Sequence, residues 1–284
     1  MGYTNIREML EGAQKGGYAI GAFNIVNYLT ACAVVDAAQQ LKTPVILQTS
    51  VSVIKKIGLK PLIDMLRPMA ERADVPVAIH LDHSDNVDLI KACIDSGWSS
   101  VMVDGSRRSF EENVRLTKQI REYARTRNVT VEGGLGAIES VEDVAVAHKR
   151  KGLFADPAKS LIFMERTGID AFAPAIGTYH GLYSVQPEID FDRLMQINDL
   201  KRTFLVIHGG TGLTGETCRR LIASGASKIN VSTAIKIAYI EAFREYLGNY
   251  PNQYNPLISD AFVLEKVINV AKEYMGKFNS VNVV

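Results

Sequence analysis

The chain has 284 residues, of which 47% are hydrophobic, and its 32 Lys and Arg residues nearly balance 31 Asp and Glu residues. This length supports a large core, and we expect residues 1–284 to form one domain. The balanced charge argues against nucleic acid or an acidic membrane as a partner. No apolar run is long enough to cross a bilayer. A small metabolite is therefore the expected partner.

The cysteines and the N-terminal residues predict a cytoplasmic protein. Cys32, Cys93 and Cys218 are too widely spaced for a metal-binding motif, so we expect buried, reduced thiols. The first residues are too polar for a secretory signal.

Short apolar runs rich in branched residues alternate along the chain with longer amphipathic stretches. The predicted strands are residues 18–23, 45–48, 77–80, 100–103, 129–132, 171–175, 204–208 and 228–231. The predicted helices between them include residues 29–41, 59–72, 87–96, 110–127, 158–167 and 215–224. Eight such units predict a (β/α)₈ TIM barrel. A doubly wound sheet is less favoured, because no glycine-rich dinucleotide motif follows the first strand.

The C-terminal part of the chain predicts further helices outside this repeat. Residues 234–247 and 261–278 show helical patterns, and a predicted loop with Pro251 and Pro256 separates them. We expect these helices to pack outside the barrel or against another subunit.

Polar residues stand at or beyond the end of every predicted strand. They are Asn24, Ser50, Asp82, His83, Asp104, Glu132, His180, His208 and Asn230. In a barrel these ends meet at one mouth, where the active site lies. Strand ends are often polar simply because they meet loops, and that explanation suffices for Asn24, Ser50 or Asp104 alone.

The histidines are harder to explain in that way, because three of only five occupy this position. His83, His180 and His208 would form a facial set of imidazoles, which is the open arrangement of catalytic zinc. His80 lies deeper in its strand and is assigned to structure. His148 follows a charged segment and is assigned to the surface.

Small residues next to His208 predict an anion site. Gly209, Gly210 and Thr211 follow the seventh strand, and Ser232 and Thr233 follow the eighth, before a helix. Backbone N–H groups and a helix N-terminus bind phosphate in these loops of a barrel. A metal beside a phosphate suggests a substrate carbonyl that the metal polarises. Asp82 is placed to exchange a proton, and Glu142 is a second candidate acid.

These segments together resemble the class II, metal-dependent ketose-bisphosphate aldolases, the family of fructose- and tagatose-bisphosphate aldolases. The resemblance runs essentially from end to end. Its carriers are Gly21-Ala22-Phe23-Asn24, Leu81-Asp82-His83, residues 100–106, Gly177-Thr178-Tyr179-His180-Gly181, His208-Gly209-Gly210-Thr211-Gly212 and residues 228–233.

The resemblance implies an enzyme that forms dihydroxyacetone phosphate and an aldehyde from a phosphorylated ketose. It implies one catalytic Zn²⁺ that is bound by His83, His180 and His208. It also implies that Asp82 activates the aldehyde oxygen. Glu142 matches the acid that handles the proton of the three-carbon unit, and Asn230 contacts the reacting carbons. The implied phosphate ligands are Gly181, Gly209, Thr211, Ser232 and Thr233. Asn24, Ser50 and Gly210 complete the expected substrate-binding set, and we also expect a monovalent cation near the phosphate. The resemblance further suggests a homodimer or homotetramer.

Three departures from the family pattern bear on these expectations. Gly134 stands where the family has a glutamate that binds a second metal with the residue matching Asp104, and Glu132 could substitute for it. Glu139-Ser140 replaces the usual Gly-Gly before Glu142, which predicts a stiffer loop. Leu257 stands where the family commonly has an arginine for the distal phosphate, so we expect an aldehyde half that lacks a terminal phosphate or is bound differently.

The sequence leaves two alternative functions open. A Schiff-base aldolase would use Lys228, the only lysine placed on a strand beside these residues, although no desolvated pocket is evident around it. A noncatalytic relative that binds a metabolite or stabilises a partner subunit is the other alternative. Against it, Asp82, the three histidines and the phosphate loop are all intact.

Overall fold

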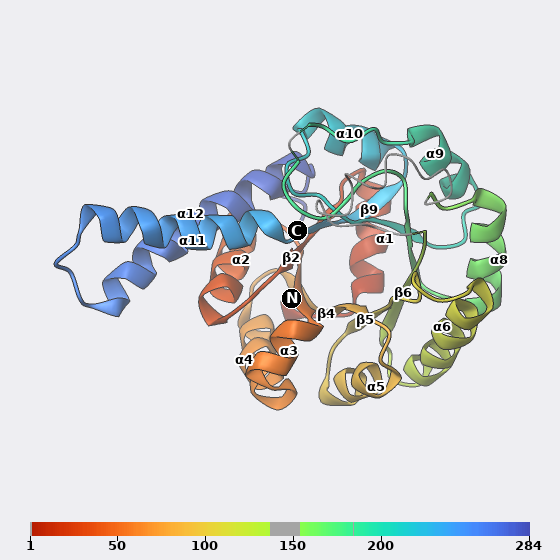
Figure 1. Cartoon of the computed structure of the whole chain (residues 1–284), viewed down its shortest axis with the longest axis horizontal. Helices are drawn as coiled ribbons and strands as arrows, with labels where there is room; N and C mark the ends of the chain where they lie inside the picture. The colour runs from red at the N-terminus through yellow and green to blue at the C-terminus, as the bar shows by residue number, and fades with distance from the viewer. Residues whose placement is uncertain (1, 137–153, 184) are drawn as a thin grey trace.

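The computed structural model describes residues 2–136, 154–183 and 185–284, and its strands form a closed parallel barrel (Figure 1). Hydrogen bonds join the strands in the order β4-β3-β2-β9-β8-β7-β6-β5, and β5 pairs back with β4. A short β1 adds to the beginning of β4. The strands are β1 (Gly2–Tyr3), β2 (Ile20–Asn24), β3 (Val45–Ser50), β4 (Pro76–Ser84), β5 (Ser100–Val103), β6 (Thr130–Leu135), β7 (Ala171–Pro174), β8 (Phe204–Ile207) and β9 (Ala226–Val231). The predicted TIM barrel with additional C-terminal helices is confirmed.

Helices surround the barrel, and polar side chains fix where many of them begin. Asn27 and Thr30 form a capping box at α2, and Ser109 and Glu112 form another at α6. The helices are α1 (Ile6–Gly16), α2 (Tyr28–Leu41), α3 (Val51–Ile57), α4 (Leu59–Arg72), α5 (Val87–Ser96), α6 (Phe110–Arg125), α8 (Pro157–Thr167), α9 (Phe191–Asp199), α10 (Gly215–Ala223), α11 (Thr233–Asn249) and α12 (Pro256–Lys277). None of the helices in the described residues combines the length and apolar character needed to cross a bilayer.

The N-terminal end of the barrel is closed by α1. Its buried face, which includes Ile6 and Leu10, packs on inward-facing side chains such as Ile46 and Val206. This apolar cluster fills the interior at the beginning of the strands. Since the strands alternate inward and outward side chains, residues two positions further along point into the same interior, nearer the mouth.

Strand β4 continues beyond its predicted end at His80 and runs to Ser84. Its pairing with β5 shifts register between Leu81 and Ser84, and His83 has φ +38°. Consecutive residues of a regular strand point to opposite faces, so this irregularity is what allows Asp82 and His83 to approach within 3.8 Å at the mouth.

The last two helices project from the barrel side by side as an arm (Figure 1). Helix α11 starts at Thr233, at the barrel mouth, and α12 returns along it to pack on α2. The prediction that Pro256 lies in a loop and that the last helix starts at residue 261 was wrong. Asn255 caps α12 and Pro256 is its first residue, where a missing N–H costs nothing.

Candidate metal centre

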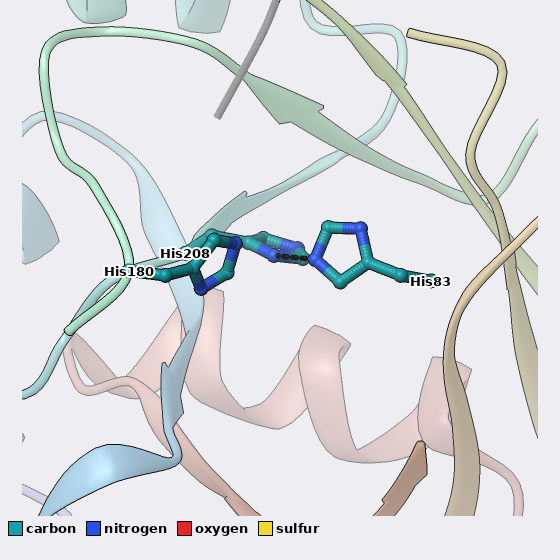
Figure 2. Close-up of side chains that lie close together, drawn as sticks. All are labelled: His83, His180 and His208. Carbon is teal, nitrogen blue, oxygen red and sulfur yellow. Dashed lines mark hydrogen bonds between the residues drawn. The ribbon is translucent and has the colours of Figure 1, made fainter. Parts of the chain in front are cut away.

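Three imidazoles from separate parts of the barrel meet at its mouth (Figure 2). His83 comes from β4, His180 from the segment that follows β7, and His208 directly follows β8. One ring nitrogen from each histidine lies within 4.8 Å of the others. His83 Nε2 and His208 Nδ1 are only 2.8 Å apart. The structure thus brings together the three histidines that the sequence singled out.

Two of these rings each form a hydrogen bond with a different carboxylate, and this bond fixes which ring nitrogen carries hydrogen. His83 Nδ1 donates to Asp104 Oδ2 at 2.7 Å, and His208 Nε2 donates to Glu132 Oε1 at 2.9 Å. An ionised carboxylate can only accept. The other nitrogens, His83 Nε2 and His208 Nδ1, therefore face each other. A proton or a metal ion lies between two such nitrogens at that distance, and imidazoles whose other nitrogen donates to a carboxylate are common ligands of zinc.

The surrounding charges act differently on the histidines. Burial lowers the pKa of His83, but Asp82 and Asp104 outweigh it and raise that pKa to about 9. Burial and the neighbouring His208 and His83 lower the pKa of His180 to about 3. The donor set, three imidazoles with acidic groups around them, fits a divalent metal ion.

Asp82 is held by a chain of amides that starts one strand away. Gln48 Nε2 donates to Asn24 Oδ1 at 2.9 Å, and Asn24 Nδ2 donates to Asp82 Oδ2 at 2.8 Å. Asp82 Oδ1 is buried and has no hydrogen-bond partner among the described residues. Burial raises the pKa of Asp82, but His83, His208 and Lys228 lower it to about 2. The carboxylate is therefore ionised and oriented, with one oxygen available for a substrate.

Lys228 lies fully buried in the barrel, where its Nζ contacts Glu132 Oε2 at 2.9 Å. The expectation that it lacks a desolvated environment was wrong, since Lys228 is the inward residue two positions before Asn230 on β9. His80 is also fully buried and bonds Ser100 Oγ at 2.8 Å. Its assignment to structure agrees with this packing.

The predicted anion-binding residues lie on neighbouring loops of the same mouth. Gly209 has φ +73°, and a Cβ there would lie 2.4 Å from Tyr179 O, so only glycine lets these two loops approach so closely. Gly210 N donates to Asn230 O at 2.8 Å, and Thr211 Oγ1 accepts from Ala234 N in the first turn of α11. The helix start thus faces the loop that carries His208.

The remaining predicted residues fall into two groups. Ser50 pairs with Asp82 in the β3–β4 register, and Asn230 Nδ2 lies 3.2 Å from His208 Nε2. Asp104 and Glu132 contact different histidines, so a second metal site on them stays a prediction. Glu142, with Glu139-Ser140 before it, and His148 lie outside the described residues.

Sequence reasoning missed Gln48 and the Lys228–Glu132 contact. The signal for both was available in part, because Gln48 and Lys228 are polar residues that period-two alternation places on the inward face. What alternation does not give is their partners, which lie on other strands.

A parallel (β/α)₈ barrel with three convergent imidazoles at its mouth defines a barrel enzyme with a candidate metal centre. Comparison with known proteins narrows this class. The family described as "Fructose-bisphosphate aldolase class-II" matches residues 4–283. A fructose-bisphosphate aldolase from Geobacillus stearothermophilus is 43% identical over 259 residues, which cover 90% of each chain. A sulfofructosephosphate aldolase from Alkalicoccus urumqiensis is 35% identical over 282 residues, which cover 99% of this chain and 98% of the relative.

Solved structures agree with the sequence relatives. The crystal structure of the YdjI aldolase from Escherichia coli K12 matches with a TM-score of 0.87 and 30% identity, covering 99% of this chain and 98% of that one. The chain belongs to the class II fructose-bisphosphate aldolase family, which is a family of metal-dependent aldehyde-lyases.

Proposed function

We propose that this protein is a zinc-dependent aldolase that reversibly cleaves a ketose 1-phosphate or ketose 1,6-bisphosphate to dihydroxyacetone phosphate and an aldehyde. The observation that carries the proposal is the cluster of His83, His180 and His208 beside Asp82 Oδ1, which has no hydrogen-bond partner in the part of the chain that the structure describes. Three imidazoles suit Zn²⁺, whose catalytic sites keep a fourth position for water or substrate. When bound, the ion would supply Lewis-acid polarisation of the substrate carbonyl.

Asp82 is the proton acceptor in the cleavage direction. Its Oδ1 takes the proton of the hydroxyl on the carbon that becomes the aldehyde. The bond from that carbon to the three-carbon unit breaks, and its electron pair stays on the three-carbon unit. Asn24 and Gln48 keep the carboxylate aimed while this happens, because they occupy its other oxygen in a continuous chain. A second acid then returns a proton to the three-carbon unit, and we assign that role to Glu142.

The phosphate of the three-carbon unit binds at the loops after β7, β8 and β9. Gly181, Gly209, Gly210 and Thr211 supply small residues and backbone N–H groups, and the start of α11 supplies favourable partial charge. Asn230, which contacts His208, lies between this site and the metal ligands, where it can bind the reacting carbons' oxygens. Ser232 and Thr233, at the helix start, complete the set, and a monovalent cation near this phosphate is a further proposal.

The residue expected to bind the far end of the substrate departs from the family pattern. Leu257 is the second residue of α12 and is 77% exposed, and its apolar side chain gives no positive charge to a distal phosphate. The relative from Alkalicoccus urumqiensis is called a sulfofructosephosphate aldolase, which names a substrate with a sulfo group. We therefore include a sulfofructose phosphate among the candidate substrates, beside the unsubstituted ketose 1-phosphate.

A homodimer or homotetramer would cover the apolar side chains of the projecting arm. These residues are exposed although large and apolar: Ile237, Ile240, Leu247, Tyr250, Tyr254, Leu257 and Ile258. Exposed apolar surface of this kind favours association. We also infer a cytoplasmic enzyme acting as one domain over residues 1–284. Burial raises the pKa of Cys93 to about 12 and that of Cys218 to about 11, which fits inert reduced thiols.

The test combines metal analysis with a substrate screen. Purified protein should contain zinc and release dihydroxyacetone phosphate from one of fructose 1-phosphate, fructose 1,6-bisphosphate, tagatose 1,6-bisphosphate or a sulfofructose phosphate, and a chelator should stop the release. A strong preference for fructose 1,6-bisphosphate over the monophosphate would refute the inference from Leu257. Zinc binding without release from any of these substrates would favour the noncatalytic alternative.

Borohydride trapping separates the metal mechanism from a Schiff base. Covalent capture of substrate at Lys228 would overturn the metal assignment. We expect none, because the Lys228 ammonium is held by the Glu132 carboxylate.

A further inference from the structure

The barrel interior holds an ion pair beneath the histidine cluster. Glu132 on β6 and Lys228 on β9 are 96 residues apart in sequence, and Oε2 and Nζ meet at 2.9 Å. Their side chains are no more than 2% exposed. Charges removed from water lose hydration that a single pairing only partly restores, so a buried pair is weak as a source of stability. Its position therefore calls for a reason other than stability.

Both oxygens of the Glu132 carboxylate are engaged, each by a different strand. Oε2 accepts from Lys228, and Oε1 accepts from His208 Nε2 at 2.9 Å. The carboxylate cannot turn away from His208 without breaking the ion pair. Lys228 thus fixes the rotamer of Glu132, and Glu132 fixes the hydrogen on His208.

The hydrogen on Nε2 decides whether the nitrogen of His208 that faces the other histidines keeps its lone pair. With Nε2 donating to Glu132, Nδ1 keeps its lone pair, and Nδ1 is the atom that lies 2.8 Å from His83 Nε2. The opposite tautomer would place hydrogen on Nδ1 and leave no lone pair toward the centre of the cluster. Lys228 therefore acts on the metal centre through two successive contacts.

The support of His83 is of another kind. Asp104, which accepts from His83 Nδ1, is 27% exposed, and its other oxygen accepts from Ser106 N at 3.1 Å in a loop. His208 is held from inside the barrel and His83 from its rim. The remaining buried neighbour of the pair, His80, has its Nε2 3.7 Å from Glu132 Oε2 and does not contact His208 through a hydrogen bond.

We propose that Lys228 and Glu132 form a positioning pair that holds His208 as an Nδ1 metal ligand. The pair touches no substrate, and its effect reaches the reaction only through His208. This inference rests on the proposed function in one respect, namely that His83, His180 and His208 bind the metal ion.

The first experiment observes the hydrogen on His208 directly in the zinc-loaded wild-type enzyme. Histidine-selective ¹⁵N labelling and long-range ¹H–¹⁵N correlation separate Nε2–H from Nδ1–H rings, and a His208→Asn sample assigns the signal. We expect a protected Nε2–H on His208, with Nδ1 bound to zinc. A His208 that carries hydrogen on Nδ1, or binds zinc through Nε2, overturns the proposal without any variant of the pair.

The second experiment measures zinc affinity by competition with a chromophoric chelator in Glu132→Gln, Lys228→Met and the double variant. Asp170→Asn is the matched control, because Asp170 is an equally buried carboxylate that pairs with Arg7 and Arg121 and contacts no histidine. We expect each single variant to bind zinc about 10- to 100-fold more weakly, as is usual when the partner of a metal-bound histidine is lost. The double variant should lose little more than either single one.

The visible spectrum of the Co²⁺-substituted proteins reports whether His208 still coordinates. We expect the spectrum to change in Lys228→Met and to stay as in the wild type in Asp170→Asn. Zinc affinity and spectrum within twofold of the control in both single variants would overturn the positioning role. Absence of zinc binding in the wild type would instead refute the proposed function, so the two failures are distinguishable.

Discussion

The closed end of the barrel and its mouth use the same strands but opposite kinds of side chain. On β3 the inward residue Ile46 is followed two positions later by Gln48, and on β8 Val206 is followed by His208. One step along the same face therefore separates an apolar layer from a polar one. The apolar layer is sealed by α1, whereas the polar layer contains buried ions and amides that form hydrogen bonds with one another.

This difference separates the part of the interior that stabilises the fold from the part that carries the chemistry. Each large apolar side chain in the apolar layer, which lies at the α1 end and is here called the lower layer, contributes about 1.5–3 kcal/mol by leaving water. In the upper layer, a buried ion loses several kcal/mol of hydration, and its partners only offset that loss. Changes in the two layers should consequently affect different measurements, and four experiments test this.

Asp82→Asn should have the largest effect on the chemistry. Asparagine keeps the shape of the side chain but cannot accept the proton, so we expect kcat to fall by about 10²- to 10⁴-fold. Zinc content and thermal stability should stay close to those of the wild type. The measurement is kcat with bound zinc determined on the same sample, and a fall of less than tenfold would exclude Asp82 as the proton acceptor.

Leu10→Ala should weaken the packing of the lower, apolar layer and leave the polar layer unchanged. Leu10 is fully buried in the face of α1 that closes the barrel. The cavity should lower the free energy of unfolding by about 2–5 kcal/mol. Denaturant titration measures this, and zinc affinity measured in parallel should be unchanged. A large loss of zinc affinity would show that the layers are not independent.

The affinity for zinc should rise with pH because ligating imidazoles must be neutral. Burial lowers the pKa of His83, but Asp82 and Asp104 raise it to about 9, so this ring is protonated below that pH. Burial and the other two histidines lower the pKa of His180 to about 3, so it is already neutral. Zinc binding between pH 6 and 8 should therefore release about one proton, and the apparent Kd should fall by about tenfold per pH unit. Calorimetry in buffers of different ionisation enthalpy counts the protons, and release of three would contradict this assignment.

Gln48→Met should have the smallest effect. It removes the amide that holds Asn24, and Asn24 in turn holds Asp82. A single hydrogen bond of about 0.5–1.5 kcal/mol corresponds to a fall in kcat of up to about tenfold. KM for the substrate and zinc affinity should hardly change. An unchanged kcat would mean that Asn24 orients Asp82 without help.

Apolar runs and their spacing were sufficient to predict the barrel, because each buried parallel strand is a short branched run followed by an amphipathic helix. The convergence of His83, His180 and His208 followed from the same reasoning, since parallel strands end at one mouth. The length of β4 did not follow, because the register shift between Leu81 and Ser84 leaves no mark in composition. Pro256 was misassigned because proline both ends and begins helices.

The contacts of the upper layer could not be predicted from one sequence. Period-two alternation places Glu132 and Lys228 inside the barrel. Their contact, however, depends on the closed barrel placing β6 opposite β9, although the two residues are 96 positions apart in sequence. The same holds for Gln48 and Asn24, whose hydrogen bond needs the register of β2 with β3.

The positive φ of His83 has a consequence for how the site is assembled. A left-handed conformation at a residue other than glycine costs about 1–3 kcal/mol, and the packing of β4 between β3 and β5 must hold it. The contacts of β4 with its neighbouring strands meet that cost when the chain folds. The same contacts turn His83 toward His208, so the fold itself orders these two proposed ligands. Removal of the ion should abolish activity, while the barrel stays folded and able to bind the ion again.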